Sequence, residues 1–185
     1  MRLKSALWAV AILLLGRSQI GVAAPVARMT PDDLAVFHAV LSFECRRIDH
    51  GYSVISDLPI SAPSTAPDWP PTSLWTKLAR RVPSGVRWPH LKVCPAGRVV
   101  DGKEIDSVFA RQTAIPPKWE PFYAAFPGAT GLLRISLPAF TPDRKHAVVY
   151  LDGTCNPLCG SGFYFGLMRR KEGWKVSRRE TAWIS

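Results

Sequence analysis

Apolar residues recur at helical spacing from residue 34 onward. The positions that follow this spacing, all apolar except the last, are Leu34, Phe37, Val40, Leu41 and Glu44. Thr30 can cap such a helix, Pro31 suits its first position, and Asp32 and Asp33 suit the positive end of the helix dipole. The pattern therefore predicts a helix from Pro31 to about Arg46 with one packed face.

Three shorter helices are indicated further along the chain. Residues 72–81 suit a helix capped by Thr72 or Ser73, and residues 105–109 and 119–126 suit one or two helical turns each. Apart from the short helix at residues 105–109, residues 83–117 carry turn signals but little other pattern. We therefore make no prediction for the fold of residues 83–117 beyond one short helix.

Strand patterns dominate the last third of the chain. Residues 132–140, 146–152, 162–170 and 174–180 are rich in β-branched and aromatic residues and are separated by short turns, and residues 52–60 have similar composition. Sequential strands joined by short turns form an antiparallel meander. The predicted class is α+β: a single domain of residues 24–185 in which an N-terminal helix and short helices pack on a C-terminal antiparallel meander.

A proline-rich segment separates the first strand from the second helix. It contains Pro63, Pro67, Pro70 and Pro71, which predicts an extended surface loop over residues 61–73. Trp69, Trp75 and Trp88 lie in or near this region and could line a groove. Tryptophan more often fills the core of a one-domain protein, so we expect packing for most of them.

The first 23 residues have the order of a secretory signal peptide. Basic Arg2 and Lys4 precede an apolar run that ends before Gly16 and Arg17, and small residues lead to Ala23. A membrane-spanning helix needs about 20 apolar residues, so an uncleaved anchor is the weaker alternative. The sequence predicts cleavage after Ala23, no membrane span in the product, and a periplasmic or secreted protein.

The charge of the chain points to anionic partners. The formal net charge is +10, and loss of the signal peptide removes three basic residues and no acid. Such a charge favours encounters with phospholipid head groups, lipopolysaccharide, wall polymers or nucleic acid. Charge alone does not identify the partner, because solvated faces routinely carry short basic clusters such as Arg80-Arg81, Arg169 to Lys171 and Arg178-Arg179. The partner therefore stays unassigned, with anionic envelope components as one candidate and nucleic acid not expected.

Four cysteines in an exported chain predict two disulfides. Cys155 and Cys159 lie four apart in a loop with Pro157 and nearby glycines, so their side chains can meet. Cys45 would then pair with Cys94, although the crossed pairings remain open. We assign these four cysteines a structural role.

Other chemistries lack their residues or spacing. The histidines His38, His50, His90 and His146 show no ligand spacing, so no metal and no cofactor is predicted. A catalytic redox site typically has Cys-x-x-Cys at the start of a helix, whereas three residues separate Cys155 and Cys159 and the pair lies between predicted strands. Ser161 lies in Cys-Gly-Ser-Gly rather than in a nucleophile elbow, and its nearest candidate partner in sequence is His146. No catalytic residue is assigned.

The C-terminal third resembles a family of uncharacterised exported bacterial proteins. The shared pattern is W..FY..FP, AVVY, C..LCGSG, GWKV and a terminal W.S, which here begins at Trp119 and ends at Ser185. This chain departs from the pattern at Asn156 and Pro157, where the family has glycine after the first cysteine. The resemblance implies a fold and an exported location and carries no activity.

These observations predict a non-catalytic exported envelope protein with a binding or accessory role and an unidentified ligand. Two alternatives stay open at this point. One is an envelope hydrolase with a site near Ser161 and His146. The other is a binder of anionic envelope polymers, whose affinity would fall as salt rises.

Overall fold

The computed structural model describes residues 29–48, 50–63, 68–81, 85–90, 92–113 and 116–185. The predicted signal peptide lies outside the described residues, as does the middle of the proline-rich segment. The described residues form four helices: α1 (Pro31–Cys45), α2 (Thr72–Arg80), α3 (Gly102–Ala110) and α4 (Glu120–Ala125). The strands are β1 (Tyr52–Ser56), β2 (Gly97–Val100), β3 (Ala129–Ile135), β4 (Ala139–Phe140), β5 (His146–Asn156), β6 (Cys159–Arg170) and β7 (Gly173–Ile184).

All described strands belong to one mixed sheet. Its order is β2-β1-β3-β5-β6-β7, and the short β4 pairs with β5 beside this path. Strands β3, β5, β6 and β7 pair antiparallel, as predicted for the meander, whereas β1 runs parallel to both β2 and β3. The predicted α+β class with its C-terminal antiparallel meander is confirmed, and β1 and β2, from earlier in the chain, add two parallel strands to one edge of the sheet.

Helix α1 covers one face of this sheet. The Thr30 hydroxyl accepts a hydrogen bond from the Asp33 amide at 3.2 Å, and the Asp33 carboxylate accepts one from the Thr30 amide at 2.8 Å. Its buried stripe includes Val36, Phe37 and Val40, none of them exposed, and it packs on the face of β5 that carries Val149. The sequence prediction for this helix is confirmed.

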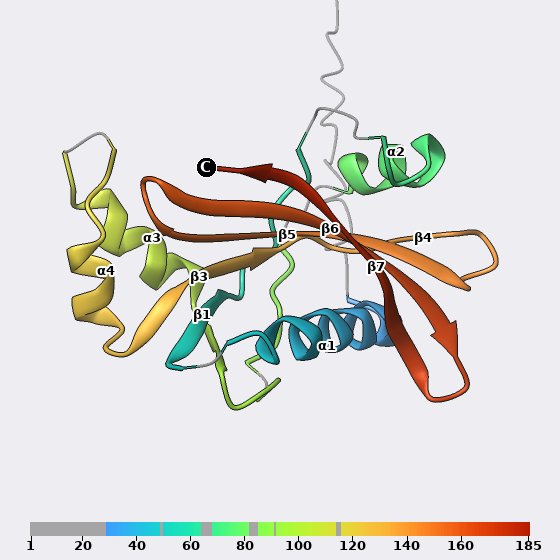
Figure 1. The fold of residues 1–185 in the computed structure, drawn as a ribbon, viewed down its shortest axis with the longest axis horizontal. Helices are drawn as coiled ribbons and strands as arrows, with labels where there is room; N and C mark the ends of the chain where they lie inside the picture. The colour runs from blue at the N-terminus through green and yellow to red at the C-terminus, as the bar shows by residue number, and fades with distance from the viewer. Residues whose placement is uncertain (1–28, 49, 64–67, 82–84, 91, 114–115) are drawn as a thin grey trace, which may run out of the picture.

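The other helices pack on the opposite face. Alternate residues of a strand point to opposite faces, so Val148 and Tyr150 of β5 face away from α1 and contact α2. Helices α3 and α4 cover Val54 of β1 and Leu132 of β3 on that same side. Figure 1 shows α1 and α2 on opposite sides of the strands, with α3 and α4 beside the start of β3.

The middle of the chain is organised around a buried carboxylate. Asp57, 2% exposed, accepts hydrogen bonds from the Gly102 amide at 2.8 Å and from Arg87 at 2.6 Å. Its carbonyl accepts the Trp88 amide, and the Trp88 ring stacks on Phe37 at 4.3 Å. These partners are distant in sequence, which explains why residues 83–117 showed so little local pattern.

None of the described helices is both long enough and apolar enough to span a membrane.

Candidate functional site

The two disulfides have the pairing expected from the sequence. Cys45, at the end of α1, is bonded to Cys94 just before β2, with Cα atoms 6.4 Å apart. Cys155 is bonded to Cys159, with Cα atoms 5.2 Å apart. The expected loop around the second pair is wrong, because β5 and β6 continue through the two cysteines and only a tight turn separates them. Both bonds therefore act as cross-links between secondary-structure elements.

The structure does not bring Ser161 and His146 together. His146 pairs with Met168 at one end of the β5–β6 ladder, whereas Ser161 pairs with Gly153 near the other end. At about 3.3 Å per residue this register separates them by roughly 20 Å. The two side chains cannot act on one substrate atom. Among the described residues, no three of His, Cys, Asp and Glu converge to hold a metal ion.

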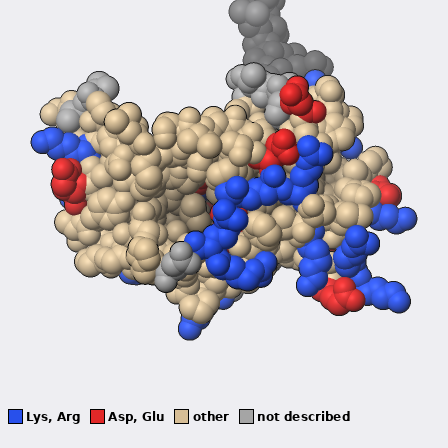
Figure 2. Space-filling view, viewed as in Figure 1, with Lys and Arg blue, Asp and Glu red and all other residues tan. Residues whose placement is uncertain are grey.

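Basic side chains gather at one end of the molecule. Figure 2 shows a band of Lys and Arg across the middle of this face and a further group of Lys and Arg at the lower right, around the β6–β7 turn, whereas fewer charged side chains are visible at the end that carries α3 and α4. We call basic end the group of bases carried by the end of α2, the β4–β5 turn and the β6–β7 turn: Lys77, Arg80, Arg81, Arg144, Lys145, Arg169, Arg170 and Lys171. Only four carboxylates share these elements and the adjoining start of α1: Asp32, Asp33, Asp143 and Glu172. The basic end thus carries a net positive charge.

A cavity of about 580 Å³ opens within the basic end. Helix α2 contributes Lys77 and Arg80, Arg81 follows directly after it, and the β4–β5 turn contributes Arg144 beside Phe140. No acidic side chain is among the described residues that line it. We call this the α2 cavity, and its lining gives it the charge needed to hold an anion.

Two of these guanidinium groups form ion pairs with carboxylates of α1. Asp33, fully buried, pairs with Arg81 at 2.8 Å, and Arg81 also donates to the Pro138 carbonyl. Asp32 pairs with Arg144 at 2.7 Å and with Arg169 at 3.2 Å. Arginine has five N–H donors, so each guanidinium keeps donors for a ligand after making these bonds.

The two other bases of the α2 cavity are not neutralised within the described structure. Lys77 and Arg80 are exposed and form no ion pair with any residue that the structure describes. The cavity therefore combines two guanidinium groups held by ion pairs, those of Arg81 and Arg144, with the long side chains of Lys77 and Arg80, which are unpaired among the described residues. This arrangement suits a ligand with more than one negative charge.

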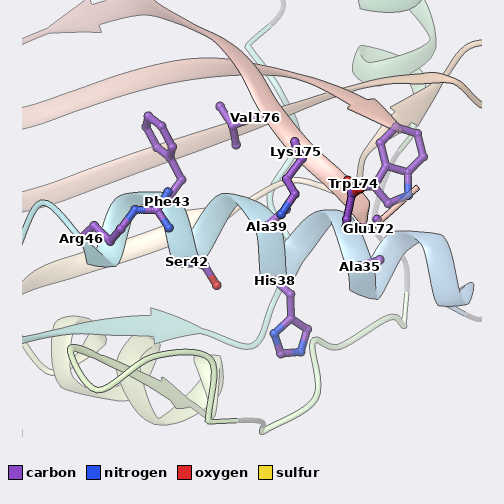
Figure 3. A pocket seen from close by; sticks show the side chains of 11 residues that line it. Ala35, His38, Ala39, Ser42, Phe43, Arg46, Glu172, Trp174, Lys175 and Val176 are labelled. Atoms are coloured by element: carbon purple, nitrogen blue, oxygen red, sulfur yellow. The ribbon is translucent and has the colours of Figure 1, made fainter. Parts of the chain in front are cut away.

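A second cavity, of about 640 Å³, runs along α1 below β7. Figure 3 shows Phe43 and Arg46 near one end of this α1 groove, Trp174 at the other, and Lys175 reaching from β7 toward the helix between them. His38 projects from the underside of α1 in the same view, away from Lys175. Its cations are accompanied by the acidic Glu172, so the α1 groove selects for negative charge less strongly than the α2 cavity.

One carboxyl group on the α2 side of the sheet has no partner. Oδ1 of Asp152 is buried and accepts no hydrogen bond from any described residue, and burial raises the pKa of this carboxyl to about 6, against the lowering effect of the nearby Arg134 charge. Close by, the Trp183 indole donates to the Tyr150 hydroxyl at 2.7 Å. Because Oδ1 is covered and has no partner among the described residues, the ionised form of Asp152 is placed to affect stability.

Sequence patterns indicated part of this site. The adjacent bases Arg80 and Arg81, and the run Arg169 to Lys171, were visible as clusters, but solvated faces often carry such clusters. Arg144 also has a basic neighbour, Lys145, but its approach to α2 was not predictable because only the fold of β4 and β5 brings the two together.

Comparison with known proteins gives no match to any protein-family model, to any curated protein or to any solved structure. The resemblance of the C-terminal third to exported bacterial proteins therefore stays a prediction.

Proposed function

We propose that this protein is a non-catalytic exported binding protein that recognises anionic components of the bacterial envelope through its basic end. The observation that carries the proposal is the α2 cavity, where four cationic side chains line one recess without an acid among the described lining residues. Two disulfides fit an oxidising compartment, in agreement with the predicted signal peptide.

The geometry favours binding over catalysis. The one candidate nucleophile and its candidate base are at opposite ends of a strand pair. The described carboxyl group whose pKa is raised to about 6, Asp152, has one buried oxygen, and neither Ser161 nor His146 is its hydrogen-bond partner. Turnover of a peptidoglycan, peptide or ester substrate that a single side-chain change abolishes would contradict this part of the proposal.

Polyphosphate is a suitable probe because it presents closely spaced charges without an apolar part. We expect it to bind at low ionic strength and to lose affinity steeply as salt rises, since the Debye length falls from about 10 Å at 0.1 M to about 3 Å at 1 M. The double variant Lys77→Gln/Arg80→Gln should lower the affinity at least about fivefold, because each base contributes a charge-assisted contact. Isothermal titration calorimetry over a salt series measures both effects.

A matched control removes the same charges from the other end of the molecule. Helix α3 carries the exposed residue Lys103, and the exposed residue Arg111 follows the last residue of this helix. Lys103→Gln/Arg111→Gln should leave the polyphosphate affinity within about twofold. Equal losses in the two double variants would mean that net charge, and not the basic end, drives binding.

A further inference from the structure

The α2 cavity borders a second recess of different character. This Trp69 cavity measures about 450 Å³ and shares Thr141 with the α2 cavity. Its apolar side chains come from the residues just before and at the start of α2 and from β5 and β6: Trp69, Pro71, Leu74, Val148 and Met168. Thr141, His146, Gly166, Ser177 and Arg178 also line it, together with Ala147 and Leu167, whose side chains lie in the core on the α1 side. A strongly cationic recess thus adjoins a mainly apolar one.

The Trp69 ring approaches β6 closely because β6 has a glycine at the point of contact. A Cβ atom added at Gly166 would lie 2.6 Å from two atoms of the Trp69 ring. The guanidinium of Arg178, the β7 partner of Gly166, lies 4.8 Å from the ring centroid. The absence of a side chain at Gly166 therefore sets the shape of the Trp69 cavity.

The hydroxyl groups of this cavity are already used inside the protein. Ser177 donates to the Gly166 carbonyl at 3.1 Å. Thr141 donates to Asp143 at 2.6 Å and accepts the His146 amide at 3.1 Å. Sugar hydroxyls placed here would lose hydrogen bonds to water and find few replacements, which costs binding free energy. Hydrocarbon would not carry that cost.

We propose that the α2 cavity and the Trp69 cavity form one bipartite site for an anionic amphiphile with a phosphate head and a single hydrocarbon chain. The head lies among Lys77, Arg80 and Arg144, and the chain lies against Trp69 and Met168. The two volumes fall in the range of small-molecule sites, which are mostly apolar with a few placed polar groups. This inference rests on the proposed function and names its ligand class.

Three soluble probes separate the two halves of the site in the intact protein. Dodecyl phosphate, below its critical micelle concentration, carries head and chain; butyl phosphate carries the head with a short chain; dodecyl maltoside carries the chain with an uncharged head. Calorimetry should show dodecyl phosphate binding at least about tenfold more tightly than either of the others, because only it fills both recesses.

Variants then assign the two parts. Met168→Gln places an uncharged amide in the Trp69 cavity and should weaken dodecyl phosphate at least about fivefold while leaving butyl phosphate and polyphosphate unchanged. Met168→Leu keeps the wall apolar and should retain the wild-type affinity. Lys77→Gln/Arg80→Gln should weaken both alkyl phosphates.

The outcomes distinguish this inference from the function on which it rests. If dodecyl phosphate binds no more tightly than butyl phosphate while polyphosphate binds at the basic end, the bipartite site is wrong and the proposed function stands. Failure of all phosphate probes overturns both. A sugar phosphate that binds more tightly than dodecyl phosphate would show that the Trp69 cavity accepts a saccharide, which also overturns the inference.

Discussion

Two aspartates of this protein lie in opposite electrostatic surroundings. Burial by itself would raise the pKa of Asp32, but hydrogen bonds from Arg144 and Trp174 and the charges of Arg169 and Arg144 outweigh it and lower that pKa below 3.8. For Asp152, burial outweighs the charge of Arg134 and raises the pKa to about 6. Asp32 therefore stabilises the fold in its ionised form, whereas ionised Asp152 destabilises it.

The Asp152 carboxyl makes stability depend on pH in an unusual direction. Its pKa is higher in the folded state than the ordinary value of 3.8, so the folded protein keeps a proton that the unfolded chain releases between about pH 4 and pH 6. The free energy of unfolding should fall across this window as pH rises. Asp152→Asn should then raise the free energy of unfolding by roughly 1–2 kcal/mol at pH 7, allowing for partial solvent screening. At pH 4 the substitution should change this free energy little.

Urea unfolding at pH 4 and pH 7 measures this difference. Asp106 of α3 is exposed and offers a matched control, since Asp106→Asn should change stability by less than about 0.5 kcal/mol at either pH. A destabilised Asp152→Asn protein at pH 7 would mean that the carboxylate makes a stabilising contact there.

Individual elements differ in how much of their structure was predictable. Helix α1 was predictable because its cap, its first-turn acids and its apolar stripe all lie within its own residues, from Thr30 to Leu41. Strand β2 was not, since its four residues are ordered by parallel pairing with β1 and by the nearby Cys94. The α2 cavity could not be predicted for the same reason, because only tertiary packing brings Arg80 and Arg144 together.

The two disulfides should contribute unequally because they close loops of different length. Cys45 and Cys94 are 49 residues apart, whereas Cys155 and Cys159 are four apart. Chain-closure entropy then gives about 4 kcal/mol for the first bond and about 2 kcal/mol for the second. Replacing each cysteine pair by serine and measuring unfolding in urea tests this order. Equal losses, or a larger loss for the second pair, would contradict it.

At the scale of the whole molecule, the basic end and the Cys155–Cys159 disulfide lie at opposite ends of the long strands. The Cys155–Cys159 bond lies at the tip of the β5–β6 hairpin, near the exposed side chains Leu158 and Ile184. The basic end lies at the other end of the same strands, where His146 pairs with Met168. The fold class could be predicted from local patterns, but this separation could not, because it depends on the register of long strands. Removing the Cys155–Cys159 bond should consequently leave anion binding intact.

Strand β7 is the outermost described strand on its side of the sheet, and it carries Lys175 and Arg178 as exposed cations. Like charges on such an edge repel a second molecule that would otherwise continue the sheet. A polyanion that covers these cations would remove that repulsion. Mixtures near charge equivalence should thus turn turbid through self-association of the protein, and the turbidity should clear when salt releases the polyanion.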